Sequence, residues 1–289
     1  MIKKPDIFII FNNYPLVIIY LIKLFYKGKL IYHNFDHEPF SKKKIIKILN
    51  FIEKQVIQDL DKVIFSNQKR ADLLKKIIRK KVNIDIVYNC LPINFFKKKN
   101  NFNKIKNINI FRIGSIGPGH GLMSLIKSFK YLPDNYNLII CGIIVDKNFH
   151  KNLLNIINKN KIKKKINIFI SVPQKVWMQK MINSDLGVAF YEPVNTSHRH
   201  MVGASQKINS YLAAGLPIIL SNEKQFKLFS KKYGCSVNTD INNPKEIAKK
   251  IKHTISNKLI FNRLKIKSEL AFKSQFNFEK QINKIEYYS

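Results

Sequence analysis

The stretch that decides the fold is Ser205–Ile219, which reads SQKINSYLAAGLPII. Its apolar residues, Ile208 and Leu212 among them, recur three and four positions apart, which is the spacing of one face of a helix. Gly215 can take the left-handed conformation that ends a helix, and Pro217 prevents the helix from resuming. An apolar run then starts, as in a buried strand. The stretch therefore predicts a helix followed directly by a strand, as in α/β proteins.

Polar residues open this predicted helix, namely Ser205, Gln206 and Lys207. At a helix N-terminus the backbone N–H groups lack partners and the helix dipole is positive, so an anion is favoured there. The sequence therefore predicts a helix start that can bind phosphate.

The composition is that of a folded protein with a large positive charge. The chain has 289 residues, 45% of them hydrophobic, which suffices for one large or two medium domains. The formal net charge of +34 suits nucleic acid, a phospholipid surface or a phosphorylated substrate. Nearly all of the excess is lysine, whereas proteins that read nucleic acid rely on arginine for paired contacts. The charge alone leaves these partner classes open.

Cysteine usage and hydropathy bear on the compartment. Cys90, Cys141 and Cys235 are isolated, without a CxxC spacing, so we expect neither a disulfide framework nor a zinc site, and a reducing cytoplasm fits best. The segment over 7–26 is the candidate membrane span, but polar residues interrupt it. We expect a strand, a polar loop and a helix there; a signal anchor is the alternative.

Short apolar runs alternate with longer amphipathic ones along the whole chain, which is typical of parallel α/β units. Strands are predicted over 7–11, 30–33, 63–66, 84–88, 109–113, 138–142, 166–169, 186–190, 218–221 and 236–238. Helices are predicted over 15–26, 42–60, 68–80, 122–131, 149–159, 174–182, 205–214, 224–232, 245–255 and 257–287. The lysine-rich run over 97–106 reads as a linker, with a surface loop as the alternative. We expect two doubly wound domains facing a cleft, over 1–100 and 105–255, and a C-terminal helical segment over 256–289 that can cross back to the first domain.

A glycine-rich loop, GSIGPGHG over 114–121, follows one predicted strand and precedes a helix. Glycines let the backbone approach a ligand closely, and the helix start offers N–H groups to phosphate. The spacing matches neither GxGxxG nor a Walker loop, so a plain connection is the alternative. The candidate binding residues of this loop are Gly114, Ser115, Gly117, Gly119 and His120.

Two stretches together, FRIGSIGPGHGLMSLIKSFKYLPDNYNLIICG and SQKINSYLAAGLPII, resemble the GT-B glycosyltransferases of the family 4 kind (glycosyl transferases group 1). The likeness extends over about 5–251. It implies two Rossmann-like domains, the first on the acceptor side and the second binding a nucleotide-sugar. It further implies a hexosyltransferase-type reaction that retains configuration, on a glycan or lipid-linked acceptor in cell-surface polysaccharide biosynthesis. The resemblance also implies that no metal is needed. No cofactor is implied either, because the nucleotide-sugar counts as a substrate.

Some residues of the family pattern are kept and others are replaced. Lys207 matches the family's lysine, and Gln206 stands where asparagine is common. Ser115 and His120 stand where the family has an arginine and a lysine that hold the donor diphosphate. Ser210 replaces a glutamate that hydrogen-bonds the donor ribose. The resemblance therefore implies weaker donor affinity, an altered donor or lost activity.

A third stretch, FISVPQKVWMQKMINSDLGVAFYEP, also resembles the family. By that likeness, backbone near Ser171, Val172 and Pro173 meets the nucleotide base. We expect Trp177 to be a helix core residue rather than a base stacker. In the following loop Arg199 is a candidate contact to the donor phosphates, with a solvated loop as the alternative; no metal site is expected there.

The first domain carries YHNFDHE over 32–38, similar to a "Y-D-x-H-E" segment of some family members. Polar groups at the end of a parallel strand face the ligand crevice. His37 is a candidate to hydrogen-bond a sugar hydroxyl or the leaving phosphate, oriented by Glu38 or Asp36. Ordinary loop polar residues are the alternative.

Family members usually have further strands before the one seen here over 4–9. We therefore expect a shortened first domain, as in a remnant, a split gene product, or a subunit whose missing strands a partner protein supplies. The first rival function is a catalytically silent GT-B binding module, and the second is a basic nucleic-acid-binding protein, which lacks a reader motif here. The expected location is the cytoplasm, with contact to an anionic membrane face as a further expectation.

Overall fold

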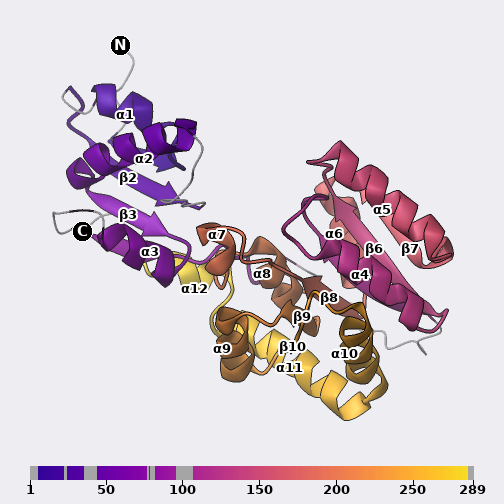
Figure 1. The fold of residues 1–289 in the computed structure, drawn as a ribbon. Coiled ribbons are helices and arrows are strands. Elements are labelled where there is room, and N and C mark those ends of the chain that lie inside the picture. Colours follow the sequence, from indigo (N-terminus) through magenta and orange to yellow (C-terminus); the bar gives the residue numbers. More distant parts are fainter. Residues whose placement is uncertain are drawn as a thin grey trace. The chain divides into compact units, whose positions relative to one another are not determined.

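The computed structural model describes residues 6–22, 25–35, 44–76, 78, 82–95 and 107–285. The chain divides into two compact units (Figure 1). Unit 1 comprises Met1–Asn89, Val194–Ala204 and Glu279–Ser289, and unit 2 comprises Cys90–Pro193 and Ser205–Phe278. The chain therefore passes through unit 1 three times, and the middle pass immediately precedes the Ser205–Ile219 stretch.

Unit 1 holds a parallel four-stranded sheet in the order β1-β2-β3-β4. Its strands are β1 (Ile7–Phe11), β2 (Lys29–Asn34), β3 (Lys62–Phe65) and β4 (Ile84–Ile86). Its helices are α1 (Leu16–Ile22), α2 (Lys44–Val56) with the 3-10 turn Ile57–Asp59, α3 (Gln68–Lys75) and α7 (Thr196–Arg199). Buried apolar residues of α1 and α2 share one core with the sheet. β1 is an edge strand, and Phe8, Ile9 and Phe11 on it are exposed.

Unit 2 holds a parallel six-stranded sheet in the order β10-β9-β8-β5-β6-β7. Its strands are β5 (Ile108–Ile113), β6 (Tyr136–Gly142), β7 (Ile166–Ile170), β8 (Leu186–Ala189), β9 (Ile218–Ser221) and β10 (Ser236–Thr239). Its helices are α4 (Leu122–Ser128), α5 (Lys147–Lys159), α6 (Gln174–Ile182), α8 (Gln206–Ala213), α9 (Lys224–Tyr233), α10 (Pro244–Ser256) and α11 (Lys258–Ser274), with 3-10 turns at Phe129–Tyr131 and Lys163–Lys165. The helix α12 (Phe278–Ile282) starts at the last residue of unit 2 and continues in unit 1.

The strand order of unit 2 reverses direction between β5 and β8. From β5 the chain goes to β6 and β7 on one side, and then returns to build β8, β9 and β10 on the other. At such a switch point the connections after the strands part, and ligands of doubly wound folds bind in the crevice at the carboxyl ends. The loop after β5 is the glycine-rich loop, so the topology places it beside this crevice.

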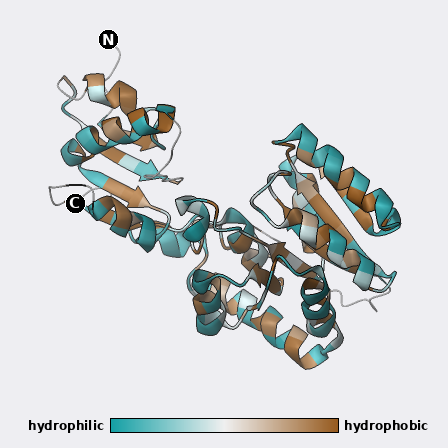
Figure 2. Ribbon diagram, viewed as in Figure 1, coloured by the Kyte–Doolittle hydropathy of each residue, from teal (hydrophilic) through white to brown (hydrophobic). Residues whose placement is uncertain are grey.

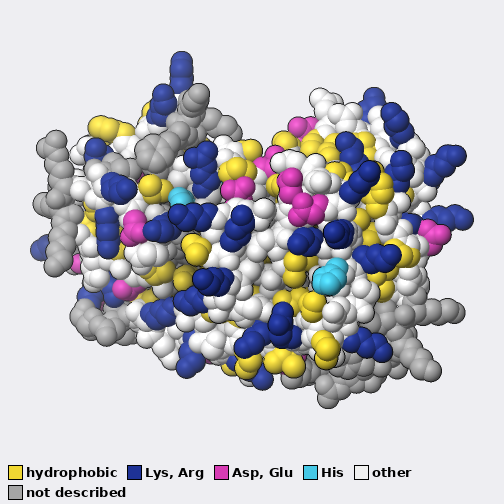
Figure 3. Space-filling view, turned by 60° about the horizontal axis from the view of Figure 1, so that its bottom comes forward, with side chains coloured by type: hydrophobic (Ala, Val, Ile, Leu, Met, Phe, Trp, Pro, Cys, Tyr) yellow, Lys and Arg dark blue, Asp and Glu magenta, His cyan; other side chains and the backbone are white. Residues whose placement is uncertain are grey.

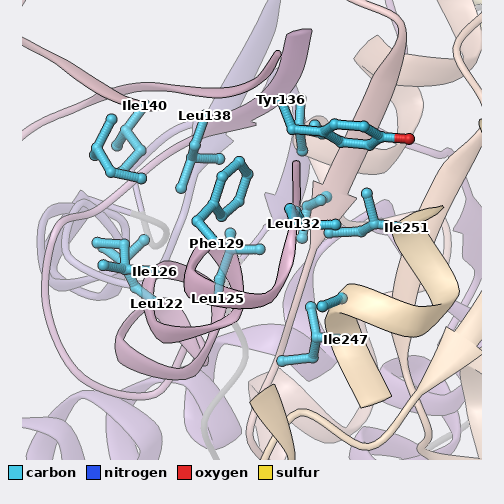
Figure 4. Packing of buried hydrophobic residues seen from close by; sticks show 14 of the residues in the cluster. Leu122, Leu125, Ile126, Phe129, Leu132, Tyr136, Leu138, Ile140, Ile247 and Ile251 are labelled. Carbon is cyan, nitrogen blue, oxygen red and sulfur yellow. The ribbon is translucent and has the colours of Figure 1, made fainter. Parts of the chain in front are cut away.

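The core of unit 2 fixes the helix that this loop enters. Leu125 of α4 and Phe129 just after it pack with Leu138 of β6, and Ile247 and Ile251 of α10 join the same cluster (Figure 4). All of these side chains are buried. Because fully burying each one stabilises the fold by about 1.5–3 kcal/mol, the start of α4 is held firmly.

The α/β fold and every predicted strand are confirmed, with bounds that differ by at most two residues. The final helical stretch predicted over 257–287 consists of two helices, α11 and α12, because the chain leaves the helical conformation at 275–277. Asn277 Nδ2 donates to Phe272 O at 2.7 Å and to Lys273 O at 2.9 Å, which satisfies the last carbonyls of α11 and ends it. The helix predicted over 68–80 ends at Lys75. The predicted linker over 97–106 lies outside the described residues.

Over the described ranges, no helix combines the length and the apolar character needed to cross a bilayer. The helix in the 7–26 segment, α1, has seven residues. A strand, a loop and a helix therefore occupy the described part of that segment, as predicted.

Candidate functional site

The glycine-rich loop over 114–121 connects β5 to α4 in a conformation that requires glycine. Gly114, Gly119 and Gly121 have φ values of 117°, 84° and 56°, which L residues rarely adopt. The Gly121 N–H donates to Glu192 Oε1 at 2.9 Å, and the Glu192 N–H donates to Gly119 O at 3.0 Å. These two bonds tie the loop to the segment that follows β8, across the switch point.

A buried arginine on β5 supports the first turn of this loop. Arg112 is 3% exposed; its Nη1 donates to Gly114 O at 2.6 Å and its Nη2 donates to Ser115 O. Burial lowers the pKa of Arg112 to about 10, so the guanidinium stays charged at neutral pH. Sequence reasoning missed this residue, although an arginine inside the apolar strand INIFRI is itself a signal.

A second cation, Lys207 of α8, reaches the same turn. A Cβ built on Gly114 would lie 2.6 Å from Lys207 Cε, so the lysine stem lies directly against that glycine. Lys207 Nζ lies 4.7 Å from the centroid of the Tyr191 ring. Desolvation, and after it the charge of Arg112, lower the pKa of Lys207 well below its usual range. Among the described residues neither Arg112 nor Lys207 is paired with a carboxylate. An anion bound beside them would favour the charged form of Lys207 against this desolvation, so their neighbourhood suits an anion.

The start of α8 is capped and anchored. Ser205 Oγ accepts a hydrogen bond from the Ile208 N–H at 3.2 Å, as an N-cap residue does. The same hydroxyl hydrogen-bonds the Tyr191 hydroxyl at 2.6 Å. Tyr191 therefore has two roles here. Its ring faces the Lys207 ammonium, and its hydroxyl hydrogen-bonds the residue that caps the helix on which Lys207 lies.

Tyr211 joins α8 to the strands on both sides of the switch point. Its hydroxyl accepts from the Ile113 N–H and donates to Val188 O, each at 3.1 Å. Gly187 makes room for the ring, because a Cβ there would lie 2.6 Å from Tyr211 Cδ2. The tyrosine thus sets the distance between the ends of β5 and β8.

Beside the loop lies a cavity of about 400 Å³ at the carboxyl ends of β5, β6 and β7. Its lining comprises Ile113, Gly114, Ser115, Cys141, Gly142, Ile143, Ser171, Val172 and Trp177. Ser171 has a φ of 51°, and its N–H donates to Gly142 O at 2.9 Å. The expectation that Trp177 is a core residue is wrong: it is half-buried and lines this cavity, because α6 buries only Met181.

The structure brings most of the predicted donor-side residues together in unit 2. Lys207 contacts Gly114, and the His120 ring packs edge-on against Tyr191, 5.6 Å between centroids. Ser210 is buried on α8, 2% exposed. The others in this unit are Ser115, Gly117 and Gly119 in the loop, Ser171, Val172 and Pro173 before α6, and Gln206 in the first turn of α8.

The remaining predicted residues belong to unit 1. Arg199 is exposed on α7, in unit 1. Asp36, His37 and Glu38 lie outside the described residues. Within the described ranges, no group of three or more His, Cys, Asp or Glu residues is placed to hold a metal ion.

The face displayed in Figure 3 bears on nucleic-acid binding, because it shows how its positive charges are spread. On the face displayed in Figure 3, lysine and arginine side chains are scattered among uncharged ones rather than gathered into one strip. A nucleic-acid footprint is a basic patch or stripe on one face. The displayed face therefore gives no support to nucleic-acid binding.

Comparison with known proteins gives one family and one fold. The model described as "Glycosyl transferases group 1" matches residues 92–270. No curated protein matches the chain. Among solved structures, HepE from Anabaena in complex with UDP is similar at 15% identity and a TM-score of 0.76, over 95% of this chain and 76% of that one. Sucrose-phosphate synthase from Thermosynechococcus elongatus is similar at 10% identity and a TM-score of 0.75, over 95% of this chain and 70% of that one. A glycosyltransferase from Rickettsia africae is similar at 15% identity and a TM-score of 0.72, over 96% of this chain and 74% of that one. At these identities the likeness shows a shared fold.

Proposed function

Because the chain belongs to the glycosyl transferases group 1 family, we propose that it transfers a sugar with retention to a glycan or lipid-linked acceptor in cell-surface polysaccharide biosynthesis. The family and the GT-B fold make it a nucleotide-sugar-dependent glycosyltransferase. The acceptor, the pathway and the stereochemistry are the proposed part.

The observation that carries the proposal is the pair of cations beside the glycine-rich loop. Arg112 and Lys207 have no carboxylate partner among the described residues, and both lie at Gly114. A leaving nucleoside diphosphate gains negative charge as the sugar bond breaks, and fixed positive groups stabilise that charge. Lys207 would contact the diphosphate, while Arg112 holds the loop and adds its field. Ser115 and His120 would add hydrogen bonds.

The cavity that Trp177 lines would take the nucleotide base. Ser171 and Val172 bring backbone groups to its wall, and an aromatic side chain offers a stacking surface. The likeness to HepE, which was solved with UDP and with UDP-glucose, supports a UDP-sugar as the donor to try first. Ser210 lacks a carboxylate for the ribose, so weaker donor affinity remains a prediction.

Several roles remain proposals. We propose Arg199 as a phosphate contact, and His37 with Asp36 or Glu38 as the groups that meet the acceptor sugar or the leaving phosphate. A protein that supplies strands to the first sheet also stays a prediction; the exposed edge of β1 is where it would pair. The cytoplasmic location stays a prediction as well.

A silent binding module is the second candidate, because Ser210 and Ser115 replace charged donor ligands. Calorimetry with UDP, GDP and ADP, followed by UDP-glucose hydrolysis and transfer, separates the two candidates. We expect saturable nucleotide binding and slow donor hydrolysis, both reduced at least tenfold by Lys207→Met. The matched control is Lys224→Met, an exposed lysine on α9, which should change neither. Binding without turnover would favour the silent module, and absence of any nucleotide binding would refute both.

A further inference from the structure

Two helices of unit 1 cover one face of its sheet and contact each other. The helix α1 buries Leu16 and Ile19, and α2 buries Val56, all in the core that these helices share with the sheet; α2 also buries Leu49. The opposite sides of both helices therefore point away from the sheet.

Those outward sides are apolar to an unusual degree. On α1 and just after it, Ile18, Leu21 and Phe25 are 60%, 65% and 80% exposed, and α1 is coloured hydrophobic over most of its length in Figure 2. Ile48 and Phe51 on α2 are 57% and 62% exposed. Further exposed apolar residues of these helices are Val17, Tyr20 and Ile45. Single exposed apolar residues are ordinary, but a group on two neighbouring helices marks an interaction site.

The charges on this surface have one sign. Lys44, Lys47 and Lys54 are exposed on α2, each three or four positions from Ile48 or Phe51, which is the spacing of neighbours on a helix surface. The single acidic residue in the sequence of the two helices is Glu53, which is 2% exposed and accepts a hydrogen bond from the Tyr32 hydroxyl at 2.7 Å. The α1–α2 surface, taken as the described residues of these two helices, thus combines exposed apolar groups and ammonium groups without an exposed carboxylate.

We propose that the α1–α2 surface docks on an anionic lipid bilayer. Apolar side chains beside lysines are the composition by which peripheral proteins enter the headgroup region, and each basic residue adds attraction to anionic lipid. A second copy of this chain is a poorer occupant, because it would bring the same lysines against each other in a protein of net charge +34. Membrane docking would bring the enzyme to a lipid-linked acceptor, and in this one respect the inference rests on the proposed function.

Flotation with vesicles tests the apolar part. The probes are vesicles of equal parts phosphatidylglycerol and phosphatidylcholine, with pure phosphatidylcholine as the comparison. We expect the wild type to float with the anionic vesicles, and the triple variant Ile18→Ser, Leu21→Ser, Phe25→Ser to bind at least about tenfold more weakly. The matched control is Leu228→Ser with Leu259→Ser in unit 2, residues that are 59% and 85% exposed; it should bind like the wild type.

Charge removal tests whether the surface, rather than total charge, is responsible. Replacing Lys44, Lys47 and Lys54 by Gln should weaken binding about fivefold per lysine. Replacing Lys224, Lys227 and Lys231 of α9 by Gln removes equal charge elsewhere and should have little effect.

Three results would overturn the inference. They are equal losses in the two lysine variants, wild-type binding by the apolar triple variant, and light scattering that shows a dimer which the apolar triple variant abolishes. Nucleotide binding, measured by calorimetry without lipid, reports separately on the proposed function.

Discussion

Replacing Gly142 by alanine should displace the glycine-rich loop over 114–121 through a single backbone contact. Gly142 ends β6, and a Cβ built there would lie 2.0 Å from Gly114 O and 3.1 Å from Gly114 C. Real Cβ atoms essentially never approach closer than 3.0 Å, so the Gly114 carbonyl must move by about 1 Å. The φ of Gly142 is not in the left-handed region, so the cost is this clash, about 1–3 kcal/mol of unfolding free energy.

Gly142→Ala should reduce turnover and UDP affinity by more than its loss of unfolding free energy alone would explain. The Gly114 carbonyl accepts from Arg112, and Gly114 and Gly142 both line the cavity. A misplacement of about 1 Å can cost on the order of a hundredfold in rate, so we expect about that loss in UDP-glucose turnover with a clear loss of UDP affinity by calorimetry.

The control for Gly142→Ala is Gly234→Ala, at the end of α9. Its φ is 64°, but its nearest neighbour is a side-chain atom at 3.6 Å and it lies outside the site, so it should cost about 1 kcal/mol of stability and leave donor binding intact. If Gly142→Ala kept wild-type UDP affinity and turnover, the assignment of the loop as the donor site would be wrong.

Three further outcomes follow from the contacts. Tyr211→Phe should lower the free energy of unfolding in urea by about 1–3 kcal/mol, because the Ile113 N–H and Val188 O lose their common partner; a change of only a few tenths would contradict this. Burial lowers the pKa of His33 to about 4, so between about pH 6.5 and 4 the unfolded chain binds a proton that the folded one does not. Stability should therefore fall on acidification across that window, by up to about 3 kcal/mol, and thermal melts of His33→Gln should lose this component. Trp177→Ala should weaken UDP binding by about 1–3 kcal/mol in calorimetry at an unchanged melting temperature, and equal affinity would exclude stacking on the base.

The elements were predictable where local chemistry and burial agree. Strand β8 is buried at all four residues, and its unbroken apolar run already indicates a parallel interior strand. The helix α8 ends where Gly215 takes a φ of 67°, as the glycine before Pro217 predicts. Such signals depend on neighbours in the sequence, so they can be read without knowing the fold.

What escaped prediction depends on contacts between distant residues. Arg112 stands in an apolar strand, and only the folded loop shows that its guanidinium binds Ser115 O. The segment over 194–204 belongs to unit 1 because buried Arg70 of α3 donates to Ser197 Oγ at 2.8 Å and to His200 O at 3.0 Å. No local pattern joins residues more than a hundred positions apart.

The most direct test of the proposed donor site uses the single tryptophan of the protein, Trp177. Trp177 lines the cavity assigned to the nucleotide base, and it is the one Trp of the chain, so its fluorescence reports on that cavity alone. Titration with UDP and UDP-glucose should give a saturable change in Trp177 emission, shifted to much higher concentration in Lys207→Met. Nucleotide binding that calorimetry detects but that leaves the emission unchanged, or no binding at all, would contradict the assignment of this cavity and of the cations beside it as the donor site.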